Sequence, residues 1–66
     1  MIILLEIQTT GESAAVSPAQ TFTDPEDALQ AFYTACAYAV KSSVDKHTVI
    51  MVNGDGKILQ LKTFNH

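Results

Sequence analysis

One stretch in the middle of the chain carries the signals of a single helix, and it constrains the fold more than any other feature. Thr23 and Asp24 are both good N-cap residues, and Pro25 suits the first helical turn. Thr23 together with Glu26 also fits a capping box, so the sequence leaves open which residue caps the helix. Acidic residues cluster at this end, where the helix dipole favours negative charge. We expect one helix over about residues 25–41.

The non-polar side of this predicted helix is wider than packing on one sheet requires. On a helical wheel it spans about 220°, whereas a helix that covers one face of a core needs about 100° or more. Ala31, Ala35 and Tyr38 form one flank of this arc. Small side chains allow another helix to approach closely, so Tyr38 is the aromatic residue that we expect to contact a partner. The alternative is that a loop of the same chain folds over this flank.

Short apolar runs on both sides of the helix predict β-strands. Residues 2–8 are too few for a stable helix and are rich in β-branched side chains. Residues 47–52 and 57–64 have the same character. Residues 14–22 alternate only weakly, and they form either a strand or a loop. Because Pro18 cannot donate a ladder hydrogen bond, a strand here would lie at a sheet edge.

The first strand is apolar on both of its faces. One face carries three aliphatic residues, Ile3, Leu5 and Ile7, and the other carries Ile2 and Leu4. This pattern indicates a central strand that is covered on both sides. We therefore predict a single domain over residues 1–66 of the α+β class. Its one helix packs on a three- or four-stranded, mainly antiparallel sheet in the order ββαββ or βαββ, and a right-handed crossover brings residues 47–52 beside the first strand.

The last two strands are joined by Asn53-Gly54-Asp55-Gly56, which fits a type I turn closed by a G1 bulge with a left-handed Gly56. This loop predicts a pairing in which Asn53 opposes Lys57. Continued along the hairpin, the same register places Met51 opposite Leu59 and Val49 opposite Leu61. One face of the hairpin would then be wholly apolar.

The charge and composition exclude several classes of protein. The chain has 47% hydrophobic residues and a net charge of −3, with four lysines and no arginine. Scattered lysines do not form the basic patch that nucleic-acid binding needs. No apolar run approaches the ~20 residues that span a bilayer, and no basic segment precedes the first run as in a signal peptide. One cysteine allows neither an internal disulfide nor a thiolate metal cluster. We expect a cytoplasmic protein that binds neither membranes nor nucleic acid.

Few residues are candidates for chemistry. Cys36 and His47 are the only plausible nucleophile and base, but Cys36 lies in the apolar arc of the helix. His47 and His66 could ligate a metal, yet no acidic or cysteine partner lies at ligand spacing, and His66 is expected to fray. The acidic residues near Asp24 are better explained by capping. We predict no enzyme activity, no metal and no cofactor.

The pattern of residues 26–33, with alanines at 35, 37 and 39, His47-Thr48-Val49 and Gly56, resembles very small uncharacterised proteins encoded in prophages and mobile elements of Gram-positive bacteria. The resemblance covers about residues 20–60. It implies a small accessory or structural protein and transfers no catalytic residue.

The surplus apolar surface predicts self-association or binding to a protein partner. A homodimer would form through the helix flank of Ala31, Ala35 and Tyr38 or through a sheet face or edge, with Ile2 and Leu4 as the sheet candidates. The alternative is a small-ligand binding module with a pocket between subunits.

Overall fold

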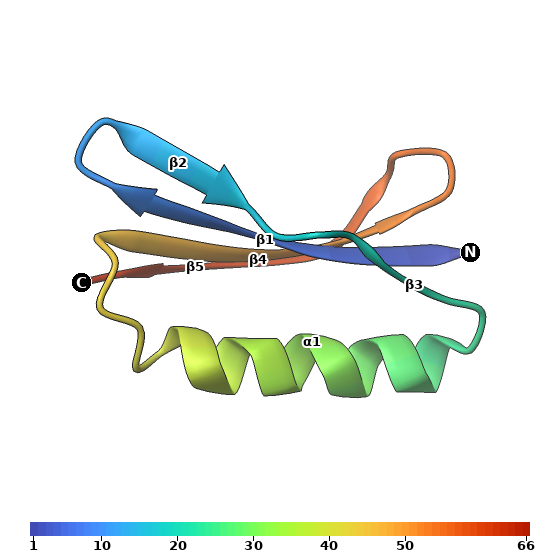
Figure 1. Cartoon of the computed structure of the whole chain (residues 1–66). Helices are drawn as coiled ribbons and strands as arrows, with labels where there is room; N and C mark the ends of the chain where they lie inside the picture. The colour runs from blue at the N-terminus through green and yellow to red at the C-terminus, as the bar shows by residue number, and fades with distance from the viewer.

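The computed structural model describes residues 1–66 and contains one helix against one face of an antiparallel sheet (Figure 1). As expected for the α+β class, strands precede the single helix and two strands follow it. The elements in chain order are β1 (Ile2–Thr10), β2 (Ser13–Val16), β3 (Gln20–Phe22), α1 (Pro25–Ala39), β4 (Lys46–Asn53) and β5 (Ile58–Asn65).

The sheet has five strands, one more than the upper limit predicted. Its order is β2-β1-β4-β5, and β3 also pairs with β1, on the same side as β2. The weakly alternating segment thus forms two short strands, with Ser17, Pro18 and Ala19 between them. The break follows from Pro18, which has no N–H to give to β1. The predictions that this segment lies at an edge and that β1 is central, with β4 on its other side, are confirmed.

Helix α1 begins as the sequence indicates and ends two residues early. Asp24 is the N-cap, and its carboxylate accepts a hydrogen bond of 2.9 Å from the backbone N–H of Glu26. At the other end, the N–H groups of Lys41 and Ser42 donate to carbonyls three residues back. These tighter bonds end the α-helix at Ala39, two residues before the approximate end predicted near residue 41.

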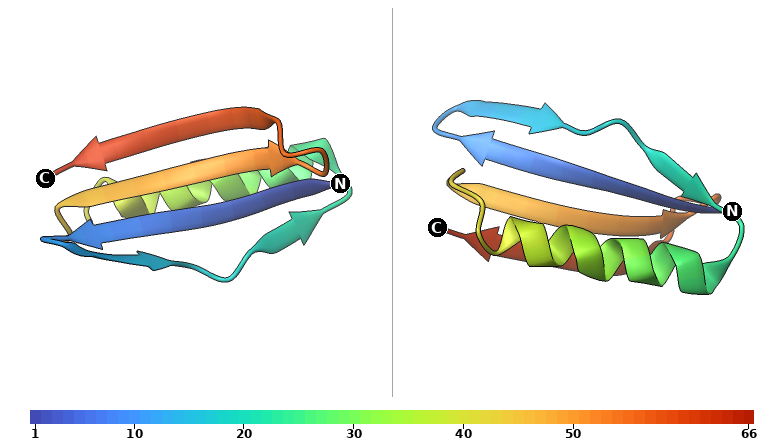
Figure 2. Two further views of the ribbon diagram at one scale, coloured as in Figure 1. Left: turned by 90° about the horizontal axis from the view of Figure 1, so that it is seen from above. Right: turned by 60° about the horizontal axis from the view of Figure 1, so that its bottom comes forward.

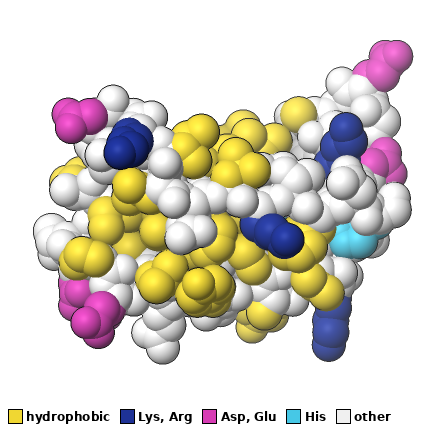
Figure 3. Space-filling view, turned by 180° about the vertical axis from the view of Figure 1, so that it is seen from behind, with side chains coloured by type: hydrophobic (Ala, Val, Ile, Leu, Met, Phe, Trp, Pro, Cys, Tyr) yellow, Lys and Arg dark blue, Asp and Glu magenta, His cyan; other side chains and the backbone are white.

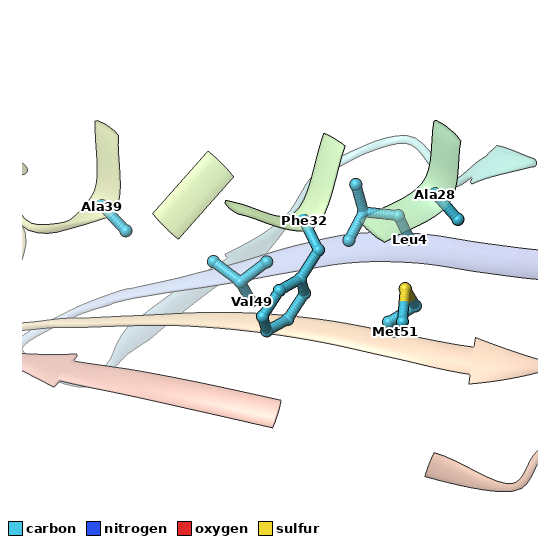
Figure 4. Close-up of a cluster of buried hydrophobic side chains, with 6 residues drawn as sticks. All are labelled: Leu4, Ala28, Phe32, Ala39, Val49 and Met51. Atoms are coloured by element: carbon cyan, nitrogen blue, oxygen red, sulfur yellow. The ribbon is translucent and has the colours of Figure 1, made fainter. Parts of the chain in front are cut away.

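The core lies between α1 and the two central strands (Figure 4). Leu4, Val49 and Met51 point from the sheet toward Phe32 of the helix, as the close-up shows. Six hydrophobic residues are fully buried: Leu4, Ala28, Phe32, Ala39, Val49 and Met51. This is a small core, as the length of the chain requires.

The hairpin of β4 and β5 keeps the predicted turn but departs from the predicted register. Asn53 N–H donates to Lys57 C=O, and Gly56 has a φ of 85°. Beyond the turn, a β-bulge shifts the pairing by one residue, so that Met51 opposes Gln60 instead of Leu59. A shift of one residue moves a side chain to the other face of the sheet.

The bulge therefore corrects the prediction of one wholly apolar hairpin face. Val49 pairs with Lys62 on the face that α1 covers, whereas Leu61 pairs with Ile50 on the opposite face. The residues of the turn correctly predicted only the pairing nearest the turn, that of Asn53 with Lys57. An extra residue in β5 was not visible in the sequence.

The last residue is held in place, contrary to the expectation that it frays. The backbone N–H of His66 donates to the carbonyl of Asp45 at 2.8 Å. Its ring nitrogens lie 2.8 Å from the carbonyl oxygen of Val44 and 3.1 Å from that of Val40. His66 thus ties β5 to the segment that links α1 to β4.

Candidate functional site

The sheet face opposite α1 is the most distinctive surface of the molecule. Side chains alternate along a strand, so the burial of Leu4, Val49 and Met51 against the helix directs their neighbours to the other side. Eight aliphatic residues lie in register on this second face, which we call the open face: Ile3, Leu5, Ile7, Val16, Ile50, Val52, Ile58 and Leu61.

No part of the chain covers the open face. Figure 2 (left) looks directly onto it, with α1 behind the strands and nothing in front of them. In Figure 3 hydrophobic side chains lie along the top of the molecule, where this face is seen edge-on. Val16 is 62% exposed and Leu61 50% exposed. We expected β1 to be covered on both sides. Within the chain, only the side that faces α1 is covered.

The open face is nearly free of charge. Among the strand residues in register with it, Lys46 at the end of β4 is the one charged side chain. Thr48 and Thr63 bond to each other through their hydroxyls at 3.0 Å. An antiparallel sheet with one solvated face ordinarily alternates apolar and polar residues. Here the strands are aliphatic on both faces. Three of the eight open-face residues are exposed (Val16, Ile58 and Leu61), and the other five are half-buried.

The residues that the sequence suggested for self-association lie on the other side of the sheet. Leu4 is 3% exposed and belongs to the core, and Ile2 packs against that core. Ala31 and Ala35 also contact it from the helix. Tyr38 is 76% exposed, so of these five it alone presents a large free surface.

Four of these residues line a common groove between α1 and β3. The groove measures about 540 Å³ and includes Leu4, Ala31, Ala35 and Tyr38, while Ile2 lies outside it. The residues that the sequence predicted as one flank of the helix therefore do lie close together. The sequence did not indicate which face of β1 packs against α1. The helix covers the face with Ile2 and Leu4, and the face with Ile3, Leu5 and Ile7 stays uncovered.

His47 is buried and paired with an acidic residue. Its side chain faces α1, and Nε2 lies 2.7 Å from Oε1 of Glu6, while Nδ1 is buried without a hydrogen-bond partner. The sequence analysis did not predict this pairing. A signal was present, because Glu6 is the only charged residue of β1 and a charged side chain that is partly buried needs a partner on its own face.

Cys36 is half-buried on the helix. Burial raises the pKa of its thiol, nearby Lys62 opposes this shift, and Glu6 adds to it. A raised pKa lowers the fraction of reactive thiolate.

The remaining polar candidates have structural roles. The acidic residues at the start of α1 cap it and complement its dipole, as Asp24 shows. Asn53 accepts from the N–H groups of Asp55 and Lys57 through its side-chain oxygen and stabilises the turn. No three His, Cys, Asp or Glu side chains come together in a geometry that could hold a metal ion.

The chain matches no known protein family, no curated protein and no solved structure in the three comparisons made. Its single helix is neither long nor apolar enough to cross a membrane. The surfaces described above are therefore the basis for assigning a function.

Proposed function

We propose that this protein is a non-enzymatic association module, and that its open face packs against the same face of a second copy to form a homodimer. The observation that carries the proposal is the sheet of eight aliphatic side chains that no segment of the chain covers. Burying such surface is the main favourable term in most protein association.

Charge favours a second copy as the occupant of this face. A twofold dimer places a surface against itself, so a charge near the twofold axis meets its own copy. The chain has a net charge of −3, yet the centre of the open face carries none. Lys46 lies at the end of its strand, where it can remain in water. The open face is thus complementary to itself in a way that the charged surfaces of the molecule are not.

Size also fits a dimer. The molecule measures 34 × 21 × 16 Å along its principal axes, so the rectangle that encloses its broadest side is about 700 Å², which is an upper bound on the area of the sheet face. A standard interface buries roughly 800 Å² per partner. The chain has only six fully buried hydrophobic residues. Covering the open face would add a second apolar layer to a domain that is small for independent stability.

A non-enzymatic role agrees with the environment of the two reactive side chains. His47 is bonded to Glu6 beneath the helix, and burial raises the pKa of the Cys36 thiol. The sequence resemblance supports an accessory or structural protein of a prophage or mobile element. The composition and the absence of a ligand motif favour a cytoplasmic protein without a cofactor.

Substitution of Ile50, on a central strand of the open face, tests the proposal. We expect Ile50→Lys to raise the dissociation constant at least a hundredfold, because two lysines would be buried near one another at the interface; a hundredfold change corresponds to about 2.7 kcal/mol. Sedimentation equilibrium measures the constant, and circular dichroism confirms that the variant folds.

Two exposed valines, one on the open face and one outside it, provide a matched pair of variants. Val16 on the open face is 62% exposed and Val40 at the end of the helix is 54% exposed. Val16→Lys should weaken association, whereas the same change at Val40 should not. Equal effects of the two changes would contradict a dimer through the open face, and so would unaltered association of Ile50→Lys.

A further inference from the structure

A second unpartnered surface lies where the helix stops short of the last strand. Helix α1 packs on β4, β1 and β3, and it leaves β5 largely uncovered on the helix side. A groove of about 270 Å³ runs between α1 and β5. Its walls include Phe32, Tyr33 and Cys36 from the helix, and Lys62 and Phe64 from the strand.

The groove is mainly apolar, and its two polar side chains are Gln60 and Lys62. The rings of Phe32 and Tyr33 meet edge to face with centroids 5.8 Å apart, and Tyr33 is 60% exposed. The ammonium of Lys62 lies 5.9 Å from the centroid of Phe64. Figure 3, which views the molecule from behind on the β5 side, shows hydrophobic side chains gathered there with a basic side chain among them.

The backbone beside this groove is also available. β5 has a partner only on its β4 side, so alternate N–H and C=O groups along its eight residues point outward. Such an edge can pair with an added strand, in which main-chain bonds supply affinity and alternate side chains supply specificity. The opposite edge of the sheet is interrupted near Pro18, so β5 is the longer continuous edge.

From these features we propose that the β5 edge binds an extended segment of a partner protein as an added antiparallel strand. Two side chains of that segment, two residues apart, face the groove. One is apolar and enters between Tyr33 and Phe64, and the other is a carboxylate that pairs with Lys62.

Charge distinguishes this partner from a second copy of the chain. β5 contains no acidic residue, so the pairing of β5 with itself offers Lys62 no carboxylate. An inward-facing lysine on an edge strand opposes self-pairing. The same lysine favours a segment with an acidic residue at the opposing position. The groove shares only Leu61 with the open face, and the inference does not depend on the proposed dimer.

A short synthetic peptide tests the proposal. The probe is acetyl-Thr-Leu-Thr-Glu-Thr-Val-Thr-amide, in which Leu and Glu fall on one side of an extended strand. The matched control has Lys in place of Glu, and a second control has Pro in place of the Thr that lies between Leu and Glu. Amide chemical shifts of the ¹⁵N-labelled protein give the binding site and the affinity. The rate at which Cys36 is alkylated shows whether the bound peptide covers the groove.

We expect shifts along β5, slower alkylation of Cys36, and binding at least tenfold weaker for the Lys control and the Pro control. Lys62→Glu should reverse the preference between the Glu and Lys peptides, and Lys62→Gln should remove it. The amide spectrum shows whether each variant folds. Repeating the titration with Ile50→Lys tests peptide binding when association through the open face is disrupted.

Three results would overturn the proposal. The first is no binding at millimolar peptide. The second is equal binding of the Glu and Lys peptides, or shifts that map away from β5. The third is protection of the β5 amides that rises with protein concentration alone, which would identify a second copy as the occupant of this edge.

Discussion

The partly buried contact between Glu6 and His47 leads to a quantitative prediction about stability. His47 is 4% exposed, and its Nε2 has one partner, the Glu6 carboxylate at 2.7 Å, while Nδ1 has none. Glu6→Ala leaves both ring nitrogens without a partner. A buried polar group that loses its partner costs about 1–3 kcal/mol. We expect Glu6→Ala to lower the free energy of unfolding by about 2 kcal/mol.

A loss of this size is easily measured in so small a domain. One kcal/mol shifts Tm by about 4–8 °C in domains of this length, so the expected shift is about 8–16 °C. Thermal unfolding followed by circular dichroism gives the value, with protein concentration held constant because association changes the apparent stability.

Two variants control for the loss of side-chain volume and of charge. Glu6→Gln keeps an oxygen that accepts from Nε2, and it should lose less than half as much as Glu6→Ala. Gln8→Ala lies on the same face of the same strand but is exposed, and it should change stability by less than about 0.5 kcal/mol. If Glu6→Ala and Gln8→Ala unfold at the same temperature, the contact contributes nothing and the reasoning is refuted.

Three further predictions address the core, the thiol and the chain end. Phe32→Ala removes the largest side chain of a six-residue core and should cost about 3–5 kcal/mol, enough to unfold much of the protein at 37 °C; urea denaturation measures this, and a cost below 1 kcal/mol would contradict the packing described. Because burial raises the pKa of Cys36, its alkylation by iodoacetamide at pH 8 should be slower than in the urea-unfolded chain, and stability should fall as pH rises above about 8.5, where the unfolded chain releases the thiol proton first; equal rates of alkylation would contradict it. His66→Ala should speed amide exchange between residues 40 and 46 and leave that of β1 unchanged, and uniform exchange rates in both proteins would show that the last residue holds nothing.

The sequence predicted those parts of the fold that depend on local chemistry. The start of the helix followed from Asp24 and Pro25, and the final turn followed from Asn53 and Gly56. The central place of β1 followed from its apolar character on both faces. Each of these features involves residues close together in the chain, where capping and turn preferences act directly.

Features that depend on distant residues were not predicted. The bulge in β5 adds one residue to the ladder, and no local signal marks it. It moves Leu61 to the open face and Lys62 to the groove. The pairing of Glu6 with His47 joins strands far apart in the sequence. The choice of which face of β1 the helix covers depends on the packing of Phe32 and Ala28 against Leu4, so periodicity alone did not indicate which apolar face of β1 stays uncovered.

The central claim is that the open face pairs with a second copy of the chain. Light scattering on a sizing column, repeated over a hundredfold dilution, tests it most directly. The monomer has a mass of 7.1 kDa. The account predicts twice that mass at high concentration, with a decrease toward the monomer on dilution. A mass of 7.1 kDa at every concentration would contradict the account.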